Sequence, residues 1–251
     1  MSALASRIET QGIATSTIGL VRPHMEASRP PRGLWVPFQL GRPLGEPEDT
    51  AFQRRVLIQA LRMLERTDGA PVILEDFPDD PPSWRDRAGW KPAVTITARP
   101  RPTQTDVAGW SAALTAELAE VLPAWEIAKA RFGRTLVGIS GQAPQVWAPF
   151  GTQFLSGQIP ASPVAHLSAP LAVRHLADDL KALYAEAVQA EGVQPSTRQI
   201  NAWFWGPSGG GSGTLAADFL RALRLVSLDS ADNAFKAFGG RFLVPGPYVG
   251  T

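Results

Sequence analysis

Cysteine is absent from this chain of 251 residues, and histidine occurs only three times. Without cysteine the protein has no disulfide, thiolate metal site, iron–sulfur cluster or cysteine nucleophile. The histidines are His24, His166 and His175, and their spacing matches no known metal-ligand motif. The sequence therefore excludes thiol chemistry, predicts no metal site and indicates no particular cofactor.

Long hydrophobic runs and an excess of charge of one sign are absent as well. No stretch approaches the roughly 18 to 20 apolar residues of a membrane helix, and residues 1–10 do not resemble a signal peptide. The 24 basic and 23 acidic residues leave a net charge of +1, so no global field attracts nucleic acid or a membrane. We expect a cytoplasmic protein without nucleic-acid or membrane partners.

The composition otherwise matches an ordinary globular protein, with 44% hydrophobic and 19% charged residues. A chain of this length buries roughly three-quarters of the surface that its unfolded form exposes. We therefore expect a single α/β domain over residues 1–251, with a βαβ part at 1–100 and a helix-rich part at 101–251.

Apolar, β-branched segments alternate with a helical pattern in the first third of the chain. Between residues 50 and 66, Arg55, Gln59 and Arg62 recur at helical spacing, and Phe52 and Val56 lie on the opposite face. Runs typical of buried strands occur at 13–21, 34–38 and 71–74. Strand, helix and strand in so short a span predict a parallel βαβ unit, and hence an α/β fold with a mostly parallel sheet and flanking helices.

Helical patterns dominate the remaining two thirds of the chain. Apolar residues at 107–125 follow a 3.6-residue period, although Pro123 is expected to kink or restart that helix. Further helices are expected at 171–190, 197–205, 215–225 and 231–238, and strands at 93–97 and 135–139.

The run from Trp35 to Gly45 reads Trp-Val-Pro-Phe-Gln-Leu-Gly-Arg-Pro-Leu-Gly and stands between a Pro-Pro-Arg turn and an arginine-rich helix. These features resemble selenoprotein B of the glycine, sarcosine, betaine and D-proline reductases, and the similarity covers about residues 5–66 of this chain. Three later segments are similar to bacterial proteins grouped with that family, at 133–141, 177–181 and 201–205.

The resemblance implies an α/β scaffold and a pocket for a small amino or carboxylic acid. The reductases use a selenocysteine or cysteine pair, which has no counterpart in a chain without cysteine. The family's catalytic role therefore transfers to no residue of this chain, and fold analogy alone is a weak argument for function.

Two glycines enclose an arginine in the loop between the second strand and the following helix. Gly41 and Gly45 would allow a tight turn whose free N–H groups favour an anion, and Arg42 could pair with a carboxylate. The alternative is that these residues only form the turn. In the first interpretation Arg22 and Arg32 would help to hold the anion.

His24 is the best-placed candidate for general acid–base catalysis. It follows the first expected strand in a predicted loop, and ligands of open α/β sheets bind near the carboxyl ends of the strands. An imidazole with an ordinary pKa near 6.5 can move a proton at neutral pH. The alternative is a plain surface histidine, which is the commoner situation.

Two further residues could contact a ligand. Ser140 lies in a small-residue turn after an expected strand, which is similar to a nucleophile elbow but lacks the full G-x-S-x-G pattern. We expect Ser140 to form the turn or to donate a hydrogen bond to a ligand. Trp90 could line a pocket, although tryptophan more often packs in a core.

Two other patterns have plain structural interpretations. His175 and Asp179 lie four residues apart on an expected helix and could form part of a polar site, but a solvated polar stripe fits them better. The glycine-rich run at 206–213 precedes a helix and could bind phosphate, but it has no Walker lysine. A flexible connection is the better interpretation of that run.

These observations favour a small-molecule enzyme of non-thiol mechanism that acts on an amine- or carboxylate-bearing compound and cleaves a carbon–heteroatom bond. Arg22, Arg32 and Arg42 would bind the anion, and His24 would move a proton. The alternative is a non-catalytic binding or partner subunit that kept the reductase-like fold. The expected partners are a small-molecule ligand and either a second copy of the chain or another protein.

Overall fold

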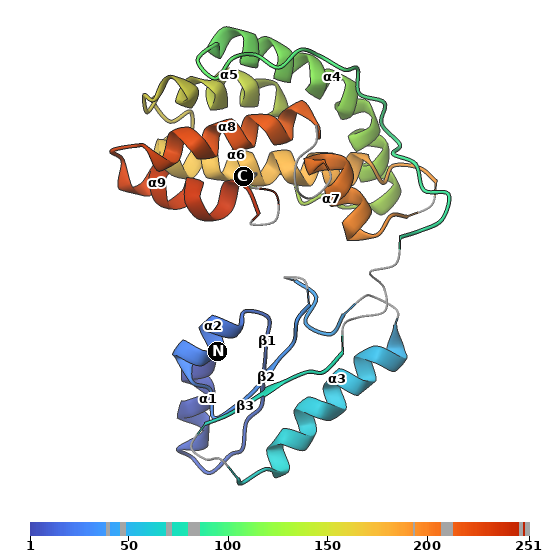
Figure 1. Cartoon of the computed structure of the whole chain (residues 1–251), viewed down its shortest axis with the longest axis vertical. Coiled ribbons are helices and arrows are strands. Elements are labelled where there is room, and N and C mark those ends of the chain that lie inside the picture. Colours follow the sequence, from blue (N-terminus) through green and yellow to red (C-terminus); the bar gives the residue numbers. More distant parts are fainter. Residues whose placement is uncertain are drawn as a thin grey trace. The chain divides into compact units, whose positions relative to one another are not determined.

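The computed structural model describes residues 1–38, 41–45, 49–68, 72–79, 86–192, 194–206, 213–245 and 248. The chain divides into two compact units, Met1–Arg85 and Asp86–Thr251, which Figure 1 draws in blue to cyan and in green to red. The sequence analysis divided the chain at residue 100, and its expectation of a single domain stays a prediction.

The N-terminal unit contains a small parallel sheet. Its strands are β1 (Thr17–Gly19), β2 (Arg32–Trp35) and β3 (Ile73–Asp76), in the order β1-β2-β3. The register places Thr17 opposite Gly33 and Arg32 opposite Ile73. The α/β class and the parallel pairing are confirmed. β1 and β2 are shorter than the apolar runs that predicted them, and β3 begins two residues later than its run.

Helices cover both faces of this sheet: α1 (Ser2–Glu9) and α2 (Arg22–Ser28) on one side and α3 (Thr50–Arg62) on the other (Figure 1). Successive strand residues point to opposite faces, so Gly33 meets α2 while Leu34 packs in the core with Val56. A Cβ atom at Gly33 would lie 2.7 Å from the Cε atom of Met25. A larger residue at this position would require the Met25 side chain to shift.

The helix predicted at 50–66 is confirmed. Asp49 caps α3 by accepting a hydrogen bond from the backbone of Phe52, and Phe52, Val56 and Ala60 are buried as the pattern predicted. A 3-10 turn at Met63–Glu65 continues the helix.

The segment that holds His24 is helical and not a loop. Pro23 stands in the first turn of α2, where its missing N–H group leaves no hydrogen bond unmade. The sequence analysis treated this proline as part of a loop, and that expectation is wrong for residues 22–28.

The C-terminal unit is helical wherever regular structure is described. It contains α4 (Val107–Phe132), α5 (Trp147–Gly151), α6 (Ala169–Ala187), α7 (Thr197–Trp205), α8 (Leu215–Leu228) and α9 (Asn233–Phe238), with short helical turns at Pro144–Val146, Thr152–Ser156 and Gly239–Leu243. Side chains from α4, α6 and α8 share one core. The helix-rich C-terminal part is therefore confirmed.

Two segments of this unit differ from the prediction, and a third prediction is settled in part. α4 passes through Pro123 without restarting, whereas a kink at this proline stays a prediction. Residues 135–139 form turns and residues 93–97 have no strand partner among the described residues, so neither segment is a strand. Leu136 and Ile139 are 74% and 56% exposed, because the apolar run has no sheet to join. Within the described part of the chain, no helix has the length and apolar character needed to cross a membrane.

Candidate functional site

Arg22 lies at the edge of the sheet where the strands end. Its Nε atom donates to Asp76 Oδ1 at 3.1 Å, it pairs with Glu26, and its guanidinium lies 5.9 Å from the ring centre of Trp35. These contacts occupy the cation with carboxylates of the same unit. Next to it on α2, His24 is exposed.

The turn that holds Gly41 and Gly45, which was predicted to bind an anion, has the tight backbone conformation expected of its two glycines. Gly41 and Gly45 both have φ of +87°, and the Gly45 N–H donates to the Arg42 carbonyl at 3.0 Å. A side chain is disfavoured at such φ values, so both glycines are needed for the turn itself. Residues 39–40 and 46–48 lie outside the described residues, and binding of an anion by the turn stays a prediction.

Arg32 lies at the opposite edge of the sheet from Arg22. It is the first residue of β2, next to Ile73 at the start of β3, and its Nη1 atom pairs with Glu9 Oε1 at 2.6 Å. Strands of a parallel sheet begin at one edge and end at the other, so the structure does not bring Arg32 together with Arg22.

Ser140 and Trp90 belong to the C-terminal unit and not to the unit of Arg22 and His24. Ser140 is fully buried, and its Oγ atom donates to Asp179 Oδ2 at 2.5 Å. The Nε1 atom of Trp90 is buried without a hydrogen-bond partner among the described residues. The ligand-binding roles of both residues stay predictions.

Asp179 is buried and is not part of a solvated stripe. Its carboxylate accepts hydrogen bonds from the backbone N–H groups of Gly138, Ile139 and Ser140 at 2.8 to 3.1 Å, besides the Ser140 hydroxyl. The solvated interpretation is therefore wrong for Asp179, because four donors replace its water. Its predicted neighbour His175 is half-buried.

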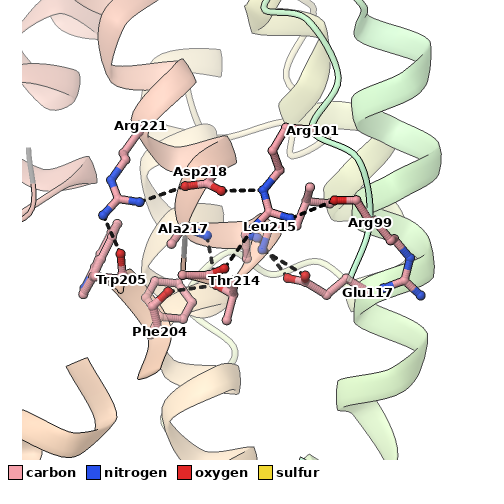
Figure 2. A network of polar contacts seen from close by, with 12 residues as sticks. Arg99, Arg101, Glu117, Phe204, Trp205, Thr214, Leu215, Ala217, Asp218 and Arg221 are labelled. Carbon is pink, nitrogen blue, oxygen red and sulfur yellow. Dashed lines mark hydrogen bonds and ion pairs between the residues drawn. The ribbon is translucent and has the colours of Figure 1, made fainter. Parts of the chain in front are cut away.

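A pocket of about 450 Å³ in the C-terminal unit combines charged and aromatic side chains. It lies beside the segment 96–101, α4, α7 and the start of α8 (Figure 2). The residues that matter for its chemistry are Thr97, Arg99, Arg101, Glu117, Trp203 and Thr214. We take this pocket as the candidate functional site.

Glu117 supplies a buried carboxylate to the wall of the pocket. It extends from α4 and is 2% exposed. Its oxygens accept a hydrogen bond from the Leu215 N–H at 2.9 Å (Figure 2). They also accept hydrogen bonds from the Ala216 N–H at 3.0 Å and from the Tyr184 hydroxyl at 2.8 Å. The positive end of the α8 dipole thus faces this negative charge. Burial, and then the Glu117 carboxylate, raise the pKa of Tyr184 well above its ordinary value.

The glycine-rich run ends where Glu117 meets α8. Residues 207–212 lie outside the described residues, so phosphate binding by the run stays a prediction. Two N–H groups at the start of α8 are already used by Glu117. An external phosphate would have to displace this internal carboxylate to use them.

Arg101 fixes the start of α8 from the other side. Its Nε atom donates to Asp218 Oδ2 at 2.6 Å (Figure 2), and its Nη2 atom donates to the Gly213 carbonyl at 2.9 Å. Asp218 also pairs with Arg221 at 2.8 Å. A further bond joins Arg101 Nη1 to the carbonyl of Arg99 at 3.1 Å.

Arg99 forms a bidentate pair with a carboxylate of α4. Its two terminal nitrogens lie 2.5 and 3.1 Å from the two oxygens of Glu120, which also accepts the Thr97 N–H at 2.9 Å. The hydrogen bond from Arg99, and then that from Thr97, lower the pKa of Glu120 from 4.5 to about 2. Arg99 is therefore held in place by an anion that stays ionised in mild acid.

This pair predicts a pH dependence. Because the pKa of Glu120 is lower in the folded chain, the stabilisation is complete above pH 4.5 and is lost as pH falls toward about 2. Carboxyl NMR titration should show the low pKa, and Arg99→Gln should return it toward the ordinary value. A pKa near 4.5 in the unchanged protein would show that the pair does not form in solution.

Gly213 predicts a second result at this site. A Cβ atom there would lie 2.2 Å from the Phe204 carbonyl oxygen, which belongs to the backbone. We expect Gly213→Ala to lower the free energy of unfolding by about 1–3 kcal/mol, because the two backbone segments must separate. Denaturant unfolding measures this, with Gly240→Ala as the control, since its Cβ would make an ordinary 3.5 Å contact. Equal effects of the two substitutions would contradict the predicted clash.

The sequence analysis missed Arg99, Arg101 and Glu117. One signal was available: Glu117 is a charged residue on the apolar face of its helix, between Leu114 and Leu118. Such a residue needs a buried partner. The arginines stand among prolines at 100 and 102, which were interpreted only as breaks.

The described residues were also searched for metal-binding groups, and the chain was compared with known proteins. Within the described ranges, no group of three or more His, Asp or Glu side chains could hold a metal ion. Comparisons with protein-family models, with curated proteins and with solved structures gave no match, so the resemblance to selenoprotein B stays a prediction.

Proposed function

We propose that the C-terminal unit binds a small compound that carries both an amine and a carboxylate. The observation that carries the proposal is the pocket of about 450 Å³, whose wall combines the Glu117 carboxylate with Arg99 and Arg101. A cavity of this size fits a small organic molecule. The amine would lie toward Glu117 and the carboxylate toward the arginines.

The free hydrogen-bonding capacity of these residues supports this orientation. Glu117 Oε2 accepts one hydrogen bond from described residues, that of the Leu215 N–H, and a carboxylate oxygen can accept about two. Arg101 uses three of its N–H groups, and a guanidinium has about five. An amine and a carboxylate would satisfy the remaining positions.

The charges around the pocket also favour a ligand without net charge. Glu120 offsets Arg99, and the residues Arg101, Arg221, Asp218 and Glu117 together sum to zero. A ligand with a single charge would leave one charge uncompensated in a partly desolvated cavity, which is unfavourable. A zwitterion keeps the balance.

The hydrocarbon part of the compound would contact Trp203. This half-buried ring lines the pocket and lies 6.1 Å from the ring of Tyr184. Aromatic side chains provide large apolar contact areas in ligand pockets.

Two broader functions were predicted from the sequence. Cleavage of a carbon–heteroatom bond with His24 as the proton carrier stays a prediction, and so does the role of a non-catalytic partner subunit. Binding of the compound by the C-terminal unit is a separate proposal, because His24 belongs to the N-terminal unit.

Native mass spectrometry and calorimetry with a panel of amino acids test the proposal. Each amino acid is compared with the amine and the carboxylic acid that lack its other charged group. We expect amino acids to bind at least about tenfold more tightly than either analogue, the equivalent of one lost charged contact. Arg101→Gln should weaken binding by a similar factor.

Arg198→Gln is the matched control, because Arg198 belongs to the same unit but pairs with Asp86 at the surface. It should leave binding unchanged. Equal binding of the amino acids and their single-charge analogues, or unchanged binding in Arg101→Gln, would refute the proposal.

A further inference from the structure

A second pocket, of about 410 Å³, lies in the N-terminal unit at the edge where the strands begin. Arg29 and Arg32 line it together with Glu9 from α1. Pro31, Val72 and Ile73 form an apolar wall. The pocket therefore places two cations beside apolar surface and is independent of the site in the C-terminal unit.

Arg29 has an unusual backbone for its residue type. It ends α2 with φ of 46° and ψ of 62°, and no other non-glycine residue of the described ranges has a positive φ. Glycine is the residue usually found at this position of a helix end, because a Cβ atom is disfavoured there. Unfavourable backbone conformations of this kind gather at functional sites.

The two arginines differ in what holds them. Arg32 is 15% exposed and is fixed by Glu9 at 2.6 Å and by the Arg66 carbonyl at 3.2 Å. No described residue forms a hydrogen bond or an ion pair with the guanidinium of Arg29, which is exposed. Arg29 is thus the cation that remains for a ligand.

Glu9 does not neutralise Arg29, because it is paired with Arg32. Its Oε1 atom accepts the Thr15 N–H and the Thr15 hydroxyl, both at 2.8 Å, as well as Arg32. Burial opposes ionisation of Glu9, but these hydrogen bonds outweigh it and hold its pKa below the ordinary value. Glu9 is a fixed anion paired with Arg32, so the pocket keeps a net charge of one positive unit.

We infer that this pocket binds a small monocarboxylate, whose charged group pairs with Arg29 and whose hydrocarbon part lies on Pro31, Val72 and Ile73. A planar carboxylate matches the paired N–H groups of a guanidinium. One uncompensated cation fits a single negative charge better than the greater charge of a phosphate. The apolar wall explains why the anion should be organic.

The test uses the full chain and NMR titration of the arginine Nε–H signals. The probes are acetate, butanoate and hexanoate, with inorganic phosphate as the competing anion. We expect the signals of Arg29 and Arg32 to shift, with affinity increasing from acetate to hexanoate. Tighter binding of phosphate than of hexanoate would overturn the inference.

Two substitutions of Arg29 separate its side chain from its backbone. Arg29→Gly and Arg29→Gln both remove the guanidinium, and both should weaken hexanoate binding at least about tenfold. Only Arg29→Gly relieves the backbone, so it alone should raise Tm, by about 2–4 °C. Undiminished binding in both variants would exclude Arg29 from the site.

Arg54→Gln, on the exposed side of α3, is the matched control and should bind hexanoate normally. Arg101→Gln should also leave this titration unchanged, because Arg101 belongs to the other pocket. Loss of binding in either control would contradict a site built on Arg29.

Discussion

Replacing Glu117 with alanine is expected to lower the free energy of unfolding by about 3–5 kcal/mol. The substitution removes the acceptor of the Leu215 and Ala216 N–H groups and of the Tyr184 hydroxyl. Leu215, Ala216 and Tyr184 are fully buried, so water cannot readily replace the carboxylate. Two N–H groups at the start of α8 and the hydroxyl of Tyr184 on α6 would remain unpaired.

Denaturant unfolding followed by circular dichroism measures this effect. Tyr184→Phe removes one of the three donors and should cost about 1 kcal/mol. Glu126→Ala is the control on the same helix, since Glu126 pairs with Lys129 at the surface, and it should change stability by less than about 0.5 kcal/mol. A similar small effect of Glu117→Ala would show that the network does not support the fold.

Asp179→Ala is expected to have an effect of similar size, about 3–4 kcal/mol. Its carboxylate holds three consecutive backbone N–H groups, those of residues 138–140, and the Ser140 hydroxyl. Asp179 and Ser140 are fully buried, whereas Gly138 and Ile139 are exposed, and no regular structure supplies other acceptors for this turn. Without Asp179 the turn should detach from α6.

Hydrogen exchange at residues 138–140 measures this detachment directly, and denaturant unfolding gives the energy. The neighbouring Asp178→Ala is the control, because Asp178 is partly exposed and pairs with Arg174 and Lys181. It should cost less than about 1 kcal/mol. If the amides of 138–140 exchange equally slowly in both variants, Asp179 is not what protects them.

The helices were predictable because the apolar spacing that indicates a helix lies within one short segment of the sequence. On α6, Leu176, Leu180 and Tyr184 recur with the helical period, and all three are buried. The helix expected at 197–205 is confirmed, and the structure shows that Ser196 begins it with a capping box to Gln199. The strands were less predictable, because pairing requires a partner: the apolar run at 135–139 has none and forms a turn.

The candidate sites were less predictable than the fold. Arg22 and Arg32 were assigned to one anion site, but they lie at the two ends of a parallel sheet, which separates them. Asp179 looked like part of a solvated stripe, because a helical pattern cannot show that a distant turn covers one carboxylate. No local pattern marks Arg99 as a partner of α4 or Arg101 as a partner of α8.

The sequence by itself determined that this protein has no thiol chemistry and that helical faces bury most of its core. Only the tertiary structure decided which polar groups meet. Glu117 binds N–H groups 98 and 99 residues further along the chain, and Arg101 binds Asp218 117 residues away. Apolar residues that face the core recur at helical spacing, and this spacing can be seen in the sequence. Each of these polar contacts depends instead on one distant residue and on the orientation of its side chain.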